Sequence, residues 1–413
     1  MPPPDNLDIA TKLVHAGERR GTPIGVPAAV PIYATSTFLY DTMAEVDKVF
    51  AGEIPGYIYT RYGNPTVAAL EEALRELETG AAACAYASGM AALHAALVAC
   101  ELGSGATVLA SQDLYGATLN LLQQVFAGFG VETVTADFSN LAALEQTARE
   151  VRPRVLIAET ISNPLLKVCD LDACAAIAQK AGARLIIDNT FATPYLCRPL
   201  EHGADFVVHS ATKYLGGHAD VMGGIVVARE QTDQAALVGV MKLVGGILGP
   251  WEAHEILRGV KTLAVRMERQ CGNARWLAER LAQDARIARV HYPALRPDTQ
   301  PVLQRTLRSP HAGAMVSVEL RENTREAAFA FMDALRLCVR STSLGDVFTS
   351  VLHPATASHR EMAPARRKQL GISDGLVRFS VGIESVDDIW ADIQQALSLS
   401  ASPAKAAITQ PPA

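Results

Sequence analysis

The sequence has 413 residues, of which 49% are hydrophobic and 19% charged, and its formal net charge is −6. This composition suits a globular protein with one large and one smaller core, and it excludes a disordered chain. Because a net negative chain offers no basic field to a polyphosphate backbone, we expect no nucleic-acid partner.

Targeting and redox signals point to the cytoplasm. The N-terminus lacks a positive region followed by an apolar one, and apolar runs stay short of the roughly 18 residues that a membrane span needs. The seven cysteines are scattered, without a C-x-x-C pair or a cluster with histidines. This pattern favours reduced core thiols over disulfides or a zinc site. We therefore predict a soluble cytoplasmic protein with no membrane contact and no metal.

The first elements in chain order are an arm and two helices. Residues 1–62 are rich in proline and glycine and show little periodicity, so we predict an extended arm. Asn64 opens an amphipathic helix that ends near Gly80. A buried helix is predicted over 88–103, with Ser88 at or near its N-cap.

Short apolar runs then alternate with helical patterns up to about residue 250. Five such runs are predicted strands, at residues 107–110, 155–158, 185–187, 206–208 and 224–227. This alternation indicates an α/β domain over 63–250, in which a mainly parallel sheet has helices on both faces.

The pattern changes after residue 250. Residues 251–284 are predicted to form one long helix, and alternating strands are predicted at 315–320 and 377–381. We expect a smaller α+β domain over 251–400, followed by a disordered tail at 401–413.

Polar side chains follow several predicted strands. In open parallel sheets, ligands bind beyond the carboxyl ends of the strands. The residues that come there are Tyr115, Asn163, Asp188, Ser210, Thr212 and Lys213. Each alone has an ordinary structural explanation, such as a turn cap. Together they predict a binding site, because separate strands would otherwise have to end in polar residues for unrelated reasons.

The chemistry that suits these residues is that of pyridoxal 5'-phosphate (PLP). A lysine such as Lys213 forms a Schiff base with its aldehyde. A carboxylate such as Asp188 keeps the pyridine nitrogen protonated. An aromatic ring such as Tyr115 can stack on it, and the helix start at Ser88 and Gly89 suits its phosphate.

Two other interpretations use the same stretch. Ser210 to Lys213 matches S-x-x-K, the nucleophile motif of serine acyl-enzymes, but the S-D-N and K-T-G elements of that class do not occur. The fold could also serve as a catalytically inactive scaffold. The presence of Lys213, Asp188, Tyr115, Arg378 and Arg61 together argues against that interpretation.

Six blocks of sequence resemble the motifs of the Cys/Met metabolism PLP-dependent family, which includes cystathionine γ-synthase, cystathionine γ-lyase and methionine γ-lyase. The blocks cover residues 57–66, 86–93, 159–168, 185–190, 209–224 and 375–384. The resemblance implies a fold type I PLP-dependent transferase with a seven-stranded sheet and a smaller C-terminal domain.

The resemblance also implies roles for individual residues. Lys213 would hold PLP and move protons, Tyr115 would stack on the ring and donate a proton to the leaving group, and Asp188 would pair with the ring nitrogen. The phosphate would lie among Ser88, Gly89, Met90, Ser210 and Thr212, and Asn163 near the 3-hydroxyl. Arg378, aided by Ser343, would bind the α-carboxylate of an amino-acid substrate.

The arm gains a role from the same resemblance. Tyr59 and Arg61 are similar to residues that reach the phosphate of a neighbouring subunit, and Tyr59 would also contact its substrate. The expected assembly is a homotetramer made of two catalytic dimers.

Two positions depart from the subfamily patterns. Ala117 stands where methionine γ-lyases have a cysteine, and Phe348 stands where cystathionine enzymes carry a glutamate. We expect the aromatic side chain of Phe348 to give a more apolar or differently shaped distal pocket. The favoured activity is γ-elimination by a cystathionine γ-lyase or methionine γ-lyase type of carbon–sulfur lyase. Cystathionine γ-synthase and O-acetyl- or O-succinylhomoserine sulfhydrylase activities are the alternatives.

Overall fold

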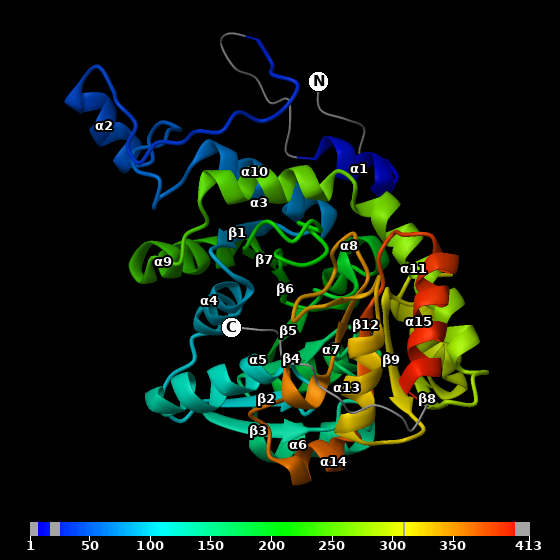
Figure 1. Ribbon diagram of the computed structural model, residues 1–413. Helices are drawn as coiled ribbons and strands as arrows, with labels where there is room; N and C mark the ends of the chain where they lie inside the picture. Colours follow the sequence, from blue (N-terminus) through cyan, green and yellow to red (C-terminus); the bar gives the residue numbers. More distant parts are fainter. Residues whose placement is uncertain (1–6, 17–24, 309, 401–413) are drawn as a thin grey trace, which may run out of the picture.

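The computed structural model describes residues 7–16, 25–308 and 310–400. The predicted disordered tail, residues 401–413, and parts of the predicted arm lie outside these ranges. Two sheets organise the described chain, with helices packed around each (Figure 1). No helix of the described residues is long and apolar enough to cross a membrane.

The larger sheet confirms the predicted α/β architecture. Its seven strands run in the order β1-β7-β6-β5-β4-β2-β3, and all neighbours are parallel except those that flank β7. The strands are β1 (Ala82–Tyr86), β2 (Thr107–Ser111), β3 (Glu132–Ala136), β4 (Val155–Glu159), β5 (Arg184–Asp188), β6 (Phe206–Ser210) and β7 (Gly224–Ala228). The five predicted strands of this region all form, while β1 and the edge strand β3 were missed.

Helices cover both faces of this sheet (Figure 1). On one face, α3 (Pro65–Leu77) and α7 (Leu171–Ala181) bury leucines such as Leu70 and Leu74. On the other face, α4 (Gly89–Ala99) and α9 (Gln234–Val244) bury Leu97 and Leu237. Both strand faces are therefore apolar, as expected for a parallel sheet between helices.

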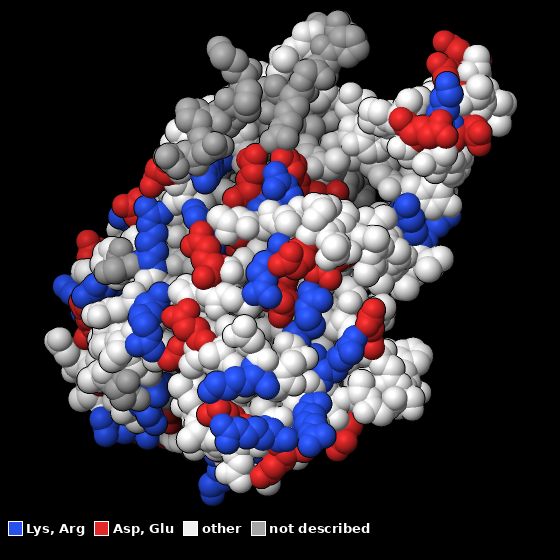
Figure 2. Space-filling view, turned by 180° about the vertical axis from the view of Figure 1, so that it is seen from behind, with Lys and Arg blue, Asp and Glu red and all other residues white. Residues whose placement is uncertain are grey.

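The remaining helices are α1 (Ile9–His15), α2 (Met43–Phe50), α5 (Gly116–Asn120), α6 (Leu141–Val151), α8 (Thr193–Leu196), α10 (Pro250–Val260), α11 (Leu263–Leu281), α12 (Gln300–Thr306), α13 (Arg325–Ala334), α14 (Pro364–Leu370) and α15 (Val386–Ser400). Helix α2 belongs to the N-terminal arm and projects from the body of the molecule (Figure 1). On the face opposite to that view, acidic and basic side chains are interspersed (Figure 2).

The smaller sheet lies in the C-terminal part of the chain. Its order is β10-β11-β12-β9-β8, formed by β8 (Ile287–His291), β9 (Met315–Leu320), β10 (Val339–Arg340), β11 (Ser350–Leu352) and β12 (Leu376–Ser380). Helices α11, α13 and α15 bury their apolar faces in the same core as this sheet.

The prediction of one long helix over 251–284 is wrong. The helical pattern breaks at Lys261 and Thr262, between α10 and α11. The hydroxyl of Thr262 donates to the Gly259 carbonyl at 3.1 Å and accepts from Arg266 Nε at 3.1 Å. A threonine side chain that bonds the backbone in this way competes with the helical ladder.

A buried polar network ties α3 to the carboxyl ends of the central strands. His209 Nε2 donates to Glu78 Oε1 at 2.6 Å, and Asn189 Nδ2 donates to the same oxygen at 2.9 Å. Thr160 Oγ1 donates to Asn189 Oδ1 at 2.7 Å. Glu78 thus holds together the ends of β4, β5 and β6, which are the strands that lead into the predicted site.

We expect Glu78→Ala to lower the free energy of unfolding by about 3 kcal/mol, because it leaves buried partners without their acceptor. Urea denaturation followed by circular dichroism measures this change. Glu132→Ala, at an exposed position of β3, is the matched control and should change stability by less than about 0.5 kcal/mol. Equal effects of the two substitutions would show that the network adds no stability.

Candidate active site

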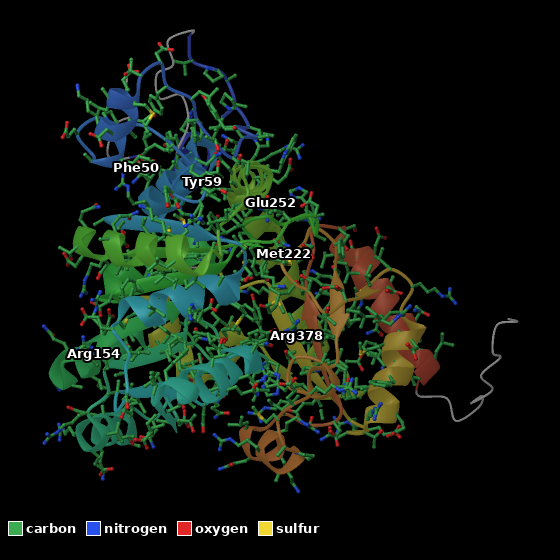
Figure 3. All side chains as sticks on the ribbon, turned by 90° about the vertical axis from the view of Figure 1, so that its left-hand side faces the viewer. Phe50, Tyr59, Arg154, Met222, Glu252 and Arg378 are labelled. Carbon is green, nitrogen blue, oxygen red and sulfur yellow. The ribbon has the colours of Figure 1, made fainter. Side chains whose placement is uncertain are left out.

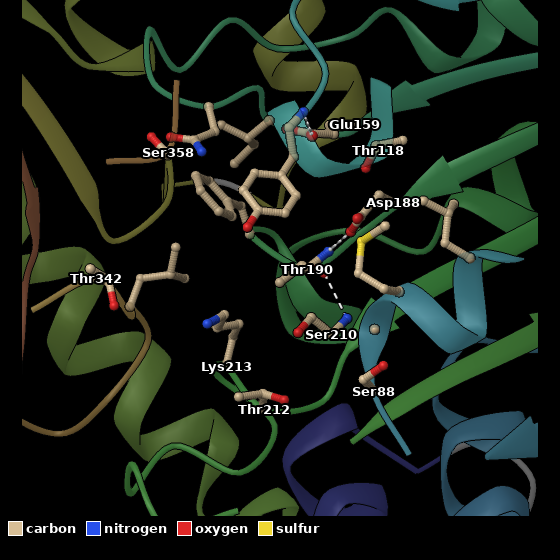
Figure 4. A pocket seen from close by; sticks show the side chains of 18 of the residues that line it. Ser88, Thr118, Glu159, Asp188, Thr190, Ser210, Thr212, Lys213, Thr342 and Ser358 are labelled. Atoms are coloured by element: carbon tan, nitrogen blue, oxygen red, sulfur yellow. Dashed lines mark hydrogen bonds between the residues drawn. The ribbon is translucent and has the colours of Figure 1, made fainter. Parts of the chain in front are cut away.

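A cavity of about 500 Å³ opens at the carboxyl ends of the parallel strands. Figure 4 shows Lys213, Asp188, Ser210 and Ser88 around this one space. The cavity is lined by Ser88, Gly89, Met90, Leu93, Tyr115, Thr118, Glu159, Ile161, Asn163, Asp188, Thr190, Phe191, Ser210, Thr212, Lys213, Met222, Thr342, Leu344, Ala357, Ser358 and Arg378. The structure therefore brings together most of the residues that the sequence predicted to share a site.

The N-terminus of α4 forms one wall of the cavity. Ser88 is the N-cap, and its hydroxyl accepts from the Ala91 N–H at 3.1 Å. A Cβ atom built on Gly89 would lie 2.8 Å from Ser210 Cβ and 2.9 Å from its Cα. Only glycine therefore lets the helix start approach β6 so closely, which leaves free backbone N–H groups near the Ser210 hydroxyl.

Asp188 ends β5 inside the cavity and is held by the residues after it. Its Oδ1 accepts from the Thr190 N–H at 2.9 Å, and Thr190 Oγ1 accepts from the Ser210 N–H at 2.9 Å (Figure 4). Burial raises the pKa of Asp188, and the hydrogen bonds from Thr190 oppose that rise. The carboxylate is thus fixed in orientation and desolvated, and a cationic ligand group beside it would favour its charged form.

Glu159 is a cavity residue to which the sequence assigned no role. Its Oε1 accepts from the Tyr115 N–H at 2.6 Å, so it fixes the backbone of the predicted stacking tyrosine. Burial, followed by the nearby charge of Asp188, raises the pKa of Glu159 well above its usual range. Its place at the end of β4 was visible in the sequence, but its partner lies 44 positions away in the chain.

Lys213 reaches the cavity from the loop after β6. Its Nζ donates to Ser343 Oγ at 3.2 Å. Burial, followed by the positive charge of Arg378, lowers the pKa of Lys213, whereas Asp346 acts in the opposite direction. A lysine with a lowered pKa is more readily available as a neutral nucleophilic amine.

Arg378 lies on the central strand β12 of the smaller sheet and is only 2% exposed. Its Nη1 donates to Asn163 Oδ1 at 2.8 Å, while its Nε has no hydrogen-bond partner within the described chain. Among the described residues, no carboxylate forms an ion pair with it. Burial lowers the pKa of Arg378 to about 10. An anionic ligand would use the unpaired donor of this guanidinium and stabilise its positive charge.

Four predicted site residues do not line this cavity in the chain. Tyr59 lies on the projecting arm, apart from Arg378 (Figure 3). Arg61 Nη1 donates to the Lys242 carbonyl at 2.6 Å. Phe348 is half-buried and lies outside the cavity lining, whereas Thr342 and Leu344 of the same loop belong to the lining. Ser343 also lies outside the lining and contacts the cavity through Lys213.

The residues present fit PLP. Lys213 and Asp188 can meet the aldehyde and the ring nitrogen from separate strands, and the close approach of Gly89 to Ser210 forms a cradle that suits a phosphate. Thr212 lines the same cavity, and its Oγ1 accepts from the Gly223 N–H at 3.0 Å.

Comparisons with known proteins agree with this geometry. Residues 10–398 match the model of the family described as Cys/Met metabolism PLP-dependent enzyme. The chain is 42% identical to L-methionine gamma-lyase of Fusobacterium nucleatum subsp. nucleatum, over 94% of this chain and 98% of that protein. It is 40% identical to O-succinylhomoserine sulfhydrylase of Pseudomonas aeruginosa, over 94% of both chains.

A solved structure is similar over the same length. The cystathionine gamma synthase from Xanthomonas oryzae pv. oryzae, in complex with aminoacrylate and cysteine, has a TM-score of 0.89 and 37% sequence identity. The match covers 95% of this chain and 98% of that chain.

We expect Gly89→Ala to weaken PLP binding at least about tenfold, because its Cβ would collide with Ser210 and displace the start of α4. Titration of the cofactor-free protein with PLP, followed by absorbance, gives the dissociation constant. Gly103→Ala is the control, because a Cβ there meets nothing within 4 Å. Unchanged affinity in Gly89→Ala would rule out this helix start as the phosphate cradle.

Proposed function

The chain belongs to the Cys/Met metabolism PLP-dependent enzyme family, and within that family we propose that it is a carbon–sulfur lyase acting by γ-elimination on a sulfur amino acid. The family and the relatives make it a PLP-dependent enzyme of γ-elimination or γ-replacement. The choice between these two reactions depends on which substrate groups the cavity can hold and on which of its residues can move protons.

The observation that carries the proposal is Arg378, a buried and unpaired cation in the same cavity as Lys213. Its planar guanidinium can bind the α-carboxylate of an amino acid with two parallel hydrogen bonds, while Asn163 holds the guanidinium in place. The substrate is then oriented with its Cα toward the lysine. PLP, when bound, supplies the electron sink for the carbanion chemistry.

Two residues of the chain would move protons in this arrangement. Lys213 Nζ, with its lowered pKa, takes a proton from the substrate carbon and returns it. Tyr115 lines the cavity, and its hydroxyl would serve as the donor to the sulfur that leaves. Asp188 keeps the ring nitrogen of the cofactor protonated, and Glu159 fixes the backbone of Tyr115.

The acidic residues of the cavity are already engaged in hydrogen bonds, and this favours an uncharged distal group on the substrate. Glu159 and Asp188 are the carboxylates among its described lining residues, and each already accepts a backbone hydrogen bond. No third carboxylate of the described chain lines the cavity to pair with a distal ammonium group. An apolar thioether such as that of methionine therefore suits the cavity better than cystathionine.

γ-Replacement on an O-acylated homoserine is the second candidate, and one feature favours it. A neighbouring cavity of about 560 Å³ shares Tyr115, Ala357 and Ser358 with the first. Arg360 and Arg366 line this second cavity, and they would suit the terminal carboxylate of a succinyl group.

We further propose that the protein is a cytoplasmic homotetramer in which arm residues Tyr59 and Arg61 complete the site of a neighbouring subunit. The arm exposes large apolar side chains, with Leu39 92% and Met43 78% exposed, which suits burial against a partner. All seven cysteines are free, in keeping with a reducing compartment.

A substrate panel tests the reaction. We expect L-methionine to give 2-oxobutyrate, ammonia and methanethiol at a higher kcat/KM than L-cystathionine gives its products. Parallel assays contain O-acetyl- or O-succinylhomoserine with a thiol. Thioether formation from these esters without any oxo acid from methionine would favour γ-replacement and contradict the proposal.

Arg378→Lys should lower kcat/KM for the amino acid about 100-fold, because a lysine cannot make the bidentate contact. PLP binding should change little, since the arginine is assigned to the substrate. Arg340→Lys, at an exposed position of β10, should leave both quantities unchanged. A loss of PLP binding without loss of substrate affinity would place Arg378 on the cofactor instead.

A further inference from the structure

Behind the lysine lies a buried carboxylate that the proposed reaction does not use. We propose that Asp346 is a positioning residue that places a buried negative charge behind the lysine segment and acts on the Lys213 nitrogen from outside the cavity. This inference rests on the proposed role of Lys213. Asp346 is 2% exposed and is absent from the cavity lining, so it touches neither substrate nor cofactor and would act through the lysine.

The loop that carries Asp346 is fastened to the lysine segment. The Val347 N–H donates to the Gly217 carbonyl at 3.0 Å, and Gln270 Nε2 of α11 donates to the Asp346 carbonyl at 2.8 Å. A Cβ on Gly345, whose φ is +84°, would lie 2.7 Å from Tyr214 N. The glycine thus permits backbone contact beside Lys213, and the contact fixes the loop that carries Asp346 relative to the lysine segment.

The carboxylate of Asp346 lacks a committed partner. Neither oxygen makes a regular hydrogen bond within the described chain, although the backbone N–H of Ala219 helps to lower its pKa. A purely structural aspartate at this depth would be expected to accept hydrogen bonds. Its charge is therefore not used in a regular hydrogen bond, and it interacts electrostatically with the nearby cations Lys213 and Arg266.

The neighbouring cations differ in how their own donors are used. Arg266 of α11 donates to the carbonyls of Tyr214 at 2.7 Å and Gly259 at 2.8 Å, so its guanidinium bonds the backbone and forms no ion pair with Asp346 among the described contacts. Lys213 is the cation of the same surroundings whose nitrogen changes its bonding during the reaction. The negative charge of Asp346 therefore matters most for the Lys213 nitrogen, where it favours the protonated form.

The charges around Lys213 oppose each other. Arg378 on β12 disfavours a positive charge on Lys213, and Asp346 favours it. Around Asp346, burial and the exposed Asp220 raise its pKa, while Lys213 and Arg266 lower it. Loss of the Asp346 charge would leave the Arg378 effect unopposed, so a positive charge on the lysine nitrogen becomes less stable.

The test measures the pH midpoint at which the visible absorbance band of the lysine-bound cofactor changes, because that midpoint reports the proton on the Lys213 nitrogen. We expect D346N to shift the midpoint to lower pH by about one unit, since an opposite charge that favoured the protonated form is removed. D346E, which keeps the charge, should stay closer to the parent than D346N does. D220N, which alters an exposed carboxylate on the loop after Lys213, should leave the midpoint unchanged.

A midpoint in D346N equal to that of the parent, or an equal shift in D220N, would overturn the inference. If D346N does not fold, as judged by thermal unfolding, D346S removes the same charge with a smaller side chain and is titrated in its place. The readout needs no substrate turnover. A parent protein with a normal band but no lyase activity therefore refutes the proposed reaction and leaves this inference standing, whereas a normal lyase with an unmoved midpoint refutes only this inference.

Discussion

Removal of charged groups from water is the constraint on which the rest of the site depends. One cavity is lined by two basic and two acidic side chains, those of Lys213, Arg378, Asp188 and Glu159. Burial lowers the pKa of the two bases and raises the pKa of the two acids, so it favours the neutral form of each. Such a set is costly unless a ligand brings complementary charges. A cofactor with a phosphate and a basic ring nitrogen, together with an amino-acid substrate, supplies those charges.

The fold makes this arrangement possible by assigning the opposing charges to different elements. Asp188 and Glu159 end adjacent parallel strands of the larger sheet, while Arg378 comes from the middle of the smaller sheet. Neither sheet alone could hold both a cofactor and a carboxylate-binding arginine. The buried Glu78 network keeps the strand ends in register on the side of the sheet away from α4.

Much of this arrangement could be predicted from the sequence because the strands of the larger sheet are short apolar runs with polar residues directly after them. The strands that were missed have a physical reason: β1 consists of small residues and a tyrosine without β-branched side chains, and β3 lies at the sheet edge and is largely exposed. Both therefore lack the run of large apolar residues that marks the other strands of this sheet.

The remaining differences arise from contacts between distant parts of the chain. The bond of Glu159 to Tyr115 and the unsatisfied carboxylate of Asp346 depend on side-chain directions that no local pattern encodes. The position of Phe348 outside the cavity has the same origin, because its loop turns at Gly345 toward the lysine segment. Residues at strand ends were thus predictable, and residues set by loop geometry were not.

The break at Thr262 gives the molecule a joint whose two sides are not equivalent. Helix α10 packs on α3, beside the larger sheet, whereas α11 shares its core with the smaller sheet. Just after the joint, Arg266 bonds both the Gly259 carbonyl before it and the Tyr214 carbonyl beside Lys213. Any rotation of the smaller sheet about this joint must therefore carry the lysine segment with it or break these bonds, so the bonds of Arg266 hold the lysine at a constant distance from the carboxylate-binding arginine when the angle between the two sheets changes.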